Sequence, residues 1–220
     1  RLINTKVAGG GGGCTDIVDN YDPFGSGGVA LYQLNGNALD SSPNAYNGTW
    51  SGTEAYGTGV FGQAGVFNGS NSRINNSSIS VSLGSEFSIS LWIKSSLDNT
   101  FQTIVEFGST VNDTLQIQKR GDNNKFRFID QNGGAVVFDI DTSVATINQW
   151  FHYAVSVSSN SYSVYENGSY VGGGTYSHTE THTGLALGYR QSNNLEHFSG
   201  SLDQVRIFNT ALDPLEVEAL

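Results

Sequence analysis

A clean two-residue alternation runs through the segment FSISLWIKSS, residues 87–96. Apolar side chains occupy every second position of it: Phe87, Ile89, Leu91 and Ile93. Mostly polar side chains fill the positions between them: Ser88, Ser90, Trp92 and Lys94. Because successive side chains of an extended strand point to opposite faces of a sheet, this pattern predicts a strand with one face in an apolar core.

Similar segments recur along most of the chain. Strand signals follow one another at short intervals in GVALYQL, TIVEFGS, TLQIQKR, KFRFIDQ, AVVFDID, WFHYAVSVSS, SYSVYENGSYV, LALGYR and GSLDQVRIF. Turn-forming residues separate them, as at residues 122–124 and at Asn167 and Gly168, which suit a two-residue hairpin turn. About a dozen short strands with almost no helical period predict an all-β antiparallel two-sheet sandwich or jelly roll.

The charge balance narrows the kinds of partner that the chain can have. Acidic residues outnumber basic ones, 20 to 10, and the formal net charge is -10 at pH 7. Such a field repels nucleic acids and anionic membrane surfaces, whereas it is compatible with divalent cations, with neutral sugars or simply with solubility. No apolar run approaches the ~20 residues of a membrane-spanning helix. We therefore expect neither nucleic-acid binding nor membrane insertion.

The polar surface is built with few charges. Charged residues make up 14% of the chain, below the ~25% of typical globular proteins, so Ser, Thr, Asn and Gly must supply most polar groups. This composition is common in extracellular and virion-surface β proteins, and we expect one of these two locations.

The first 28 residues differ from the rest of the chain. They contain a run of five glycines, Gly9 to Gly13, which cannot form a core and loses much entropy on ordering. We interpret residues 1–28 as an arm or linker that contacts neighbouring chains in an assembly. The single cysteine, Cys14, lies in this arm, so no internal disulfide can form.

Several segments of residues 29–220 resemble a known family in their order along the chain. They are NGNALDSSPNAYNGT, FGQAGVFNGSNSRI, FSISLWIK, NQWFHYAVSV, YSVYENGSYV, LALGYR and FSGSLDQVRIFNTALDPLEVEAL. This succession resembles laminin-G-like, concanavalin A-like lectin jelly rolls. The resemblance implies that the last strand lies beside the first. It also implies that the final DPLEVEAL forms a short helical turn against the sandwich, for which Asp213 is a suitable N-cap and Pro214 a suitable first residue.

The same resemblance implies a structural calcium ion near the first and last strands. The matching positions are Asp40 and Asp203, with Asn35 and Asn37 offering further oxygens. Calcium prefers six to eight hard oxygen ligands, so two carboxylates beside a turn are suitable chemistry. In the alternative interpretation, Asp40 caps the following turn and Asp203 accepts backbone N–H bonds. Gln204 stands where the family often has an acid, which removes one charge from the predicted site.

Enzymatic activity has little support in the sequence. Glucanases share this fold, and their chemistry needs two carboxylates about 5–9 Å apart across a sugar cleft. Asp139 and Asp141 lie on one face of a predicted strand, but the solvent face of an edge strand explains them better. His178, Glu180 and His182 alternate in SHTETHTG. They indicate a polar sheet face, with a metal-binding surface as the alternative.

For ligand binding, the useful residues are aromatic and polar side chains on loops at one rim of the sandwich. The candidates are Trp50, Tyr56, Tyr189, Arg190 and Asn193. We therefore predict a non-enzymatic surface recognition module that binds a carbohydrate or a protein receptor. The alternative is a structural or decoration lobe of a particle or fibre, whose arm mediates assembly; the arm resembles segments of tailed-phage structural proteins. A glycoside hydrolase is the third possibility.

Overall fold

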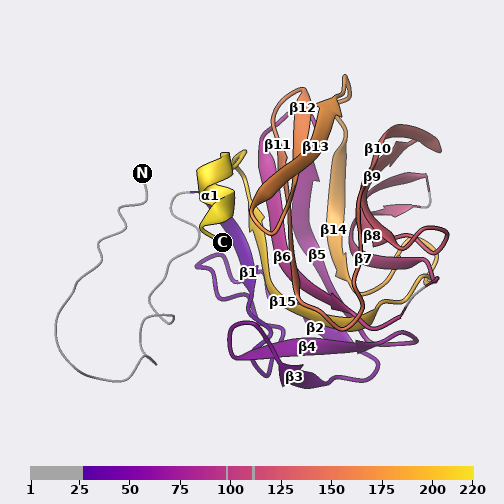
Figure 1. The fold of residues 1–220 in the computed structure, drawn as a ribbon. Coiled ribbons are helices and arrows are strands. Elements are labelled where there is room, and N and C mark those ends of the chain that lie inside the picture. Colours follow the sequence, from indigo (N-terminus) through magenta and orange to yellow (C-terminus); the bar gives the residue numbers. More distant parts are fainter. Residues whose placement is uncertain (1–26, 98, 111) are drawn as a thin grey trace.

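The computed structural model describes residues 27–97, 99–110 and 112–220 of the chain. Nearly all of the glycine-rich arm, with Cys14, lies outside these described residues. The described chain contains fifteen strands and one short helix near the C-terminus (Figure 1). All strand pairs are antiparallel and form two sheets, so the predicted all-β sandwich is confirmed.

The first sheet, here called sheet A, has eight strands. Seven of them follow the order β13-β12-β11-β6-β15-β4-β3, and β1 pairs with part of β15. Their bounds are β1 Gly28–Tyr32, β3 Tyr56–Thr58, β4 Gln63–Asn68, β6 Phe87–Ser95, β11 Phe151–Val157, β12 Ser161–Glu166, β13 Ser169–Thr175 and β15 Ser199–Phe208. The pairing of the first strand with the last confirms the closure that the family resemblance implied.

The second sheet, here called sheet B, has seven strands in the order β10-β9-β8-β7-β14-β5-β2. Their bounds are β2 Thr49–Ser51, β5 Arg73–Ser82, β7 Gln102–Thr110, β8 Asp113–Lys119, β9 Lys125–Asn132, β10 Ala135–Val144 and β14 Thr181–Leu187. Figure 1 shows the two sheets as layers, with β7 to β10 on the right and helix α1 on the left. β10 ends the sheet, which agrees with the edge-strand interpretation of Asp139 and Asp141.

The core lies between the two sheets and follows the two-residue alternation. In β6 the four apolar side chains predicted to face the core are no more than 2% exposed, as are Leu115 and Ile117 of β8 and Phe128 of β9. These side chains pack into one continuous cluster. Alternate residues of the same strands therefore point to the outer face of each sheet.

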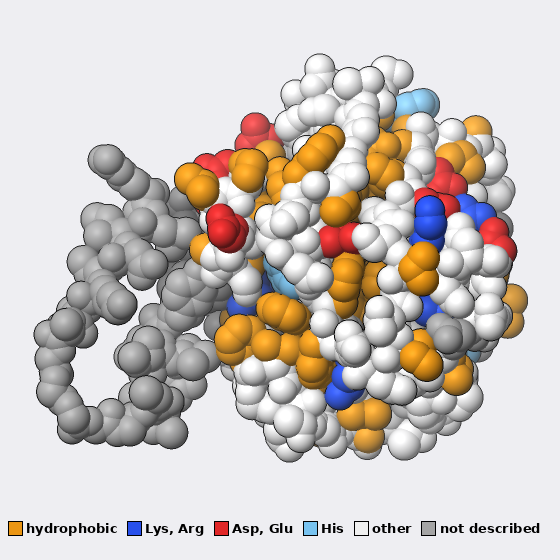
Figure 2. All heavy atoms as spheres, viewed as in Figure 1, with side chains coloured by type: hydrophobic (Ala, Val, Ile, Leu, Met, Phe, Trp, Pro, Cys, Tyr) orange, Lys and Arg blue, Asp and Glu red, His pale blue; other side chains and the backbone are white. Residues whose placement is uncertain are grey.

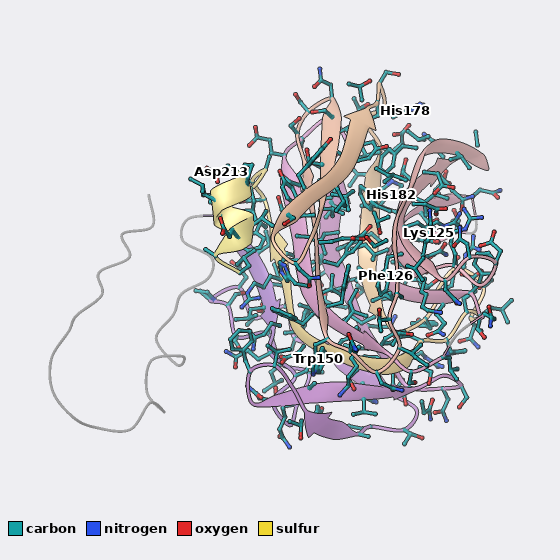
Figure 3. All side chains as sticks on the ribbon, in the orientation of Figure 1. Lys125, Phe126, Trp150, His178, His182 and Asp213 are labelled. Atoms are coloured by element: carbon teal, nitrogen blue, oxygen red, sulfur yellow. The ribbon has the colours of Figure 1, made fainter. Side chains whose placement is uncertain are left out.

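Helix α1, Pro214–Glu218, covers the outer face of sheet A. Asp213 is its N-cap and accepts from the N–H groups of Leu215 and Glu216, while the Glu216 carboxylate accepts from the Asp213 N–H, which completes a capping box. Val217 packs against Ala154 and Tyr165. Figure 3 shows Asp213 at this helix, on the side of the molecule away from β8 to β10. The predicted helical turn is thus confirmed, with Val217 as its buried anchor.

The prediction of one polar face for His178, Glu180 and His182 is wrong for His182. Its side chain is 2% exposed, and its Nε2 lies 2.8 Å from Asp130 Oδ1 in the interior. His178 is exposed instead and its Nδ1 lies 3.0 Å from Glu180 Oε1. Figure 3 shows His182 among the strands and His178 at one end of the molecule. Alternation failed because β14 begins only at Thr181, so the three residues do not share one strand.

No helix within the described ranges has the length and apolar character needed to cross a bilayer.

Candidate functional site

Asp40 is held in a turn that follows the first strand. Its Oδ1 accepts from the N–H groups of Leu31 and Ser42, both at 2.8 Å. Its Oδ2 accepts from Ser42 Oγ at 2.7 Å and from the Tyr46 N–H at 2.8 Å. The side chain is therefore engaged at both oxygens, in the turn-capping role considered as the alternative to calcium binding.

Asp203 lies on β15 and is fully buried. Its Oδ2 accepts from the N–H groups of Val60 and Phe61, in the loop between β3 and β4. Its Oδ1 is buried and has no hydrogen-bond partner among the described residues. Burial raises the pKa of this carboxyl above its usual range, and the two N–H bonds offset only part of that effect.

Asn35 and Asn37 lie in the neighbouring loop. Asn35 Oδ1 accepts from the Gln63 N–H at 2.6 Å, so Asp203 holds the middle of the loop 59–62 and Asn35 holds the start of β4. Asn37 Oδ1 accepts from the Leu39 N–H at 2.9 Å on the exposed surface. Within the described chain, no three His, Cys, Asp or Glu side chains are grouped as a metal site. Calcium binding stays a prediction.

Trp50 and Tyr56, two of the five predicted ligand residues, lie together at the edge of the core. Their ring centroids are 5.5 Å apart, and Trp50 also stacks on Phe67 at 5.2 Å. The Trp50 Nε1–H donates to the carbonyl of Thr53 at 3.0 Å. Trp50 packs on the apolar core, as a large ring at a sheet edge does.

The other three predicted residues lie on the loop 188–198, between β14 and β15. Tyr189 is 7% exposed, and its hydroxyl accepts from Asn75 Nδ2 at 2.7 Å. Arg190 donates to Glu196 Oε1 at 3.2 Å, and Asn193 Oδ1 accepts from the Leu195 N–H at 3.0 Å. The structure thus divides the predicted ligand residues into two groups, one at the edge of the core and one on this loop.

This loop is fastened to the outer face of sheet B by a buried carboxylate. Glu106 of β7 accepts from the N–H of Gln191 and from Ser192 Oγ at 3.0 Å. It also accepts from Gln116 Nε2 of β8 at 2.9 Å. Burial raises the pKa of Glu106, and the hydrogen bonds from Ser192, Gln191 and Gln116 counter only part of that rise. Glu106 therefore fixes the position of the loop across the sheet.

A chain of polar side chains crosses the outer face of sheet B beside this loop. Gln118 of β8 donates through Nε2 to Glu196 Oε2 at 2.9 Å and accepts at Oε1 from Arg127 Nη2 of β9 at 2.7 Å. Arg127 Nη1 then lies 3.1 Å from Asp139 Oδ2 of β10. At the other end of the chain, Arg190 donates to Glu196. The network joins three strands and the loop, and each group is held by a partner.

Part of this network reaches the surface. Arg127 and Asp139 have side-chain exposures of 17% and 31%, and Arg190 and Glu196 have 18% and 22%. Gln131 of β9 belongs to the same surface, since Arg190 Nη2 donates to its Oε1 at 3.4 Å. Figure 2 shows acidic and basic side chains side by side on the right of the molecule, where β8 to β10 lie. We call Arg127, Gln131, Asp139, Arg190 and Glu196 the polar face.

Sequence reasoning identified only Arg190 of the polar face as a ligand candidate. It considered Asp139 as an acid but assigned it to a solvent-exposed edge. A signal was present in the segment TLQIQK, where Thr114, Gln116 and Gln118 fill every second position of a buried strand. A polar stripe that is buried at alternate positions indicates that the outer face of a sheet is itself covered.

One protein-family model matches most of the chain. Residues 67–218 match a laminin G family model described as "Concanavalin A-like lectin/glucanases superfamily". The comparison with curated protein sequences gives no match.

Two kinds of solved structure resemble this chain in fold: a domain of an arabinanase and the binding domains of toxins. Domain 4 of AbnA, a GH43 extracellular arabinanase from Geobacillus stearothermophilus, in complex with arabinotriose, is 26% identical. It has a TM-score of 0.73, and the alignment covers 86% of this chain and 96% of that one. The binding domain of Paraclostridial Mosquitocidal Protein 1 is 20% identical, with a TM-score of 0.72 and coverages of 88% and 51%.

The receptor binding domain of the botulinum neurotoxin C/D mosaic serotype is 16% identical, with a TM-score of 0.70 and coverages of 87% and 50%. The chain thus spans about half the length of these two toxin domains. At such identities the toxin structures share the fold with this chain.

Proposed function

Because the chain belongs to the concanavalin A-like lectin/glucanase superfamily, we propose that it is a non-catalytic binding domain that recognises a carbohydrate through the polar face. The observation that carries the proposal is the continuous hydrogen-bonded network of Arg127, Asp139, Arg190 and Glu196 on the outer face of sheet B. The arabinotriose complex of the similar arabinanase domain supports a sugar as the ligand.

The chemistry of the polar face suits sugar hydroxyls. Arginine donates several N–H bonds in a fixed plane, carboxylates accept from hydroxyls, and the Gln131 amide does both. Arg127 is held by Gln118 and by Asp139, so its position is set before a ligand arrives. Such pre-organisation lowers the side-chain entropy that is lost on binding. The face can therefore bind hydroxyl pairs without first rearranging.

The binding experiment uses isothermal titration calorimetry with arabinotriose. We expect Arg127→Ala to weaken binding about ten- to hundredfold, because hydrogen bonds to a charged group contribute about 1.5–3 kcal/mol each and 1.4 kcal/mol is a factor of ten. The matched control is Lys94→Ala, which removes one cation from the outer face of sheet A, where Lys94 Nζ lies 4.8 Å from the Trp150 ring. Equal losses in both variants, or none in Arg127→Ala, would contradict the assignment.

The location follows from the same proposal. The arabinanase that contains the similar domain is extracellular, and we infer an extracellular location for this chain too. The virion surface and the assembly role of the arm have no counterpart among the comparisons and stay predictions. The assembly contact would fall on residues outside those that the structure describes, apart from the start of β1.

We further propose that calcium binds at Asp203. The fit is partial: the buried Asp203 Oδ1 has no hydrogen-bond partner in the described part of the chain, whereas both oxygens of Asp40 are engaged. In this proposal, Asn35 Oδ1, which accepts from the Gln63 N–H, and backbone carbonyls of the loop 59–62 would supply neutral oxygens to the ion. Bound calcium would place a positive charge beside this buried carboxylate and would fix the loop.

Calcium at Asp203 should appear as thermal stabilisation. A ligand at a hundredfold excess over its Kd adds about 2.7 kcal/mol, which raises the Tm of a chain of this size by about 5–10 °C. We expect this shift in the unmodified protein and in Asp40→Asn, but not in Asp203→Asn, when calcium and chelator are compared by calorimetry. A calcium response that survives in Asp203→Asn would place the ion elsewhere.

A further inference from the structure

We propose that the polar face selects neutral glycans and rejects acidic ones, and that Asp139 is the residue that sets this preference. The inference rests on the proposed function, since it names the class of sugar that the same face accepts. It is carried by two further features: the pairing of the arginines with carboxylates and the covering of the Tyr189 ring on the loop 188–198.

Three arginines on this side of sheet B have carboxylate partners. Arg127 Nη1 lies 3.1 Å from Asp139 Oδ2, and Arg190 Nη1 lies 3.2 Å from Glu196 Oε1. A third arginine, Arg120 at the end of β8, lies 2.5 Å from Asp122 and 3.3 Å from Asp141. These three guanidinium groups are thus neutralised in place.

Because the arginines are neutralised, neutral ligands bind more favourably than acidic ones. A sugar carboxylate or sulfate would have to displace a protein carboxylate from its guanidinium, or lie beside it and meet like-charge repulsion. The net charge of -10 adds to this unfavourable field. A neutral hydroxyl pair instead bridges donor and acceptor, because each ion pair offers an N–H and a carboxylate oxygen side by side. Lys125, at the start of β9, is a cation of this region outside these three sets of ion pairs.

The Tyr189 ring of the loop 188–198 is not open for stacking. Tyr189 is 7% exposed; His197 lies nearly parallel to it, with centroids 5.8 Å apart and planes at 14°. The guanidinium of Arg73 lies over the same ring, 5.3 Å from its centroid. The ligand therefore meets hydrogen-bonding groups rather than a flat apolar surface, and it is recognised by the edges of its rings.

Asp139 is positioned to control selectivity because it pairs with the exposed end of Arg127. Replacing it by asparagine keeps the shape but takes this carboxylate away from the guanidinium, while Gln118 still holds the other side. Neutral sugars then lose the charged acceptor and keep only the weaker amide oxygen, whereas a sugar carboxylate gains a cation that is free to pair with it. The substitution should shift the preference in opposite directions for the two ligand classes.

The test measures calorimetric affinities for arabinotriose and for trigalacturonate, an acidic trisaccharide, with the full chain. We expect the unmodified protein to bind trigalacturonate at least about tenfold more weakly than arabinotriose. We expect Asp139→Asn to lose about tenfold for arabinotriose and to gain for trigalacturonate. The matched control is Asp213→Asn, which makes the same charge change at the helix N-cap on the other side of the molecule and keeps a good capping residue.

The possible outcomes distinguish a failure of this inference from a failure of the proposed function on which it rests. Equal or tighter binding of trigalacturonate by the unmodified protein would overturn the neutral preference and leave glycan recognition standing. The same gain for trigalacturonate in Asp213→Asn as in Asp139→Asn would assign the effect to net charge and overturn the role of Asp139. No binding of either sugar by folded protein would overturn the proposed function itself, and this inference with it.

Discussion

We expect the Asp40→Ala variant to lose about 4 kcal/mol of unfolding free energy, among the larger effects of a single substitution. The buried carboxylate accepts four hydrogen bonds, three of them from backbone N–H groups of Leu31, Ser42 and Tyr46. Alanine would leave these donors without an acceptor beside the first strand. Because β1 pairs with β15 next to this turn, the loss should also loosen the closure of sheet A.

Guanidinium chloride unfolding measures this change, since the midpoint shifts in proportion to stability when the slope is constant. The matched control is Asp213→Ala, which also removes a carboxylate that accepts two N–H bonds, but on an exposed helix N-cap. That substitution should cost about 1 kcal/mol. A loss in Asp40→Ala no larger than in the control would show that the turn does not depend on the buried carboxylate.

The Gly188→Ala variant should lose about 3 kcal/mol of unfolding free energy. Gly188 begins the loop that carries Arg190 and Glu196, and it has a φ of +82°. A Cβ at this position would lie 2.2 Å from Cδ1 of Phe67, a residue that is 1% exposed and whose ring packs against Trp50 and Phe198. The variant would combine backbone strain with overpacking, each of which costs roughly 1–3 kcal/mol.

Gly133→Ala separates these two contributions. Gly133, in the turn between β9 and β10, also has a positive φ, +56°, but no atom lies within 4 Å of the place that an alanine Cβ would occupy there. This control should cost about 1 kcal/mol, from the backbone alone. If both variants lost the same stability, the contact between Gly188 and the Phe67 ring would not matter.

We also expect weaker arabinotriose binding in Gly188→Ala, because the start of the loop would shift.

Local patterns in the sequence were sufficient to predict most of the fold. The alternation in β6, the turn at Asn167 and Gly168, and the N-cap at Asp213 each involve residues close together in the chain, and the structure confirms all three. Where an element boundary was misjudged, the alternation misled: His182 lies inside the core with Asp130, a partner from another strand. Periodicity indicates which side a residue faces only once the strand's ends are known.

The candidate site depended on contacts that no local pattern contains. Glu106 is hydrogen-bonded to Gln191, 85 positions away, and Asp203 to Val60, 143 positions away. Aromatic residues on loops were reasonable ligand candidates, but the Tyr189 ring is covered by Arg73 and His197. Which loop lies over which sheet is set by tertiary packing, and this decides whether a ring meets solvent or another side chain.

The most direct test of the polar face is a titration of ¹⁵N-labelled protein with arabinotriose, followed by NMR chemical shifts of the backbone and side-chain N–H groups. We expect the shifts to concentrate on Arg127, Gln131, Asp139 and the loop 188–198, and to saturate with one affinity. The amides of sheet A around Trp150 and helix α1 should not move. Shifts that concentrate around Trp150 and helix α1, or none at saturating sugar, would contradict carbohydrate recognition by the outer face of sheet B.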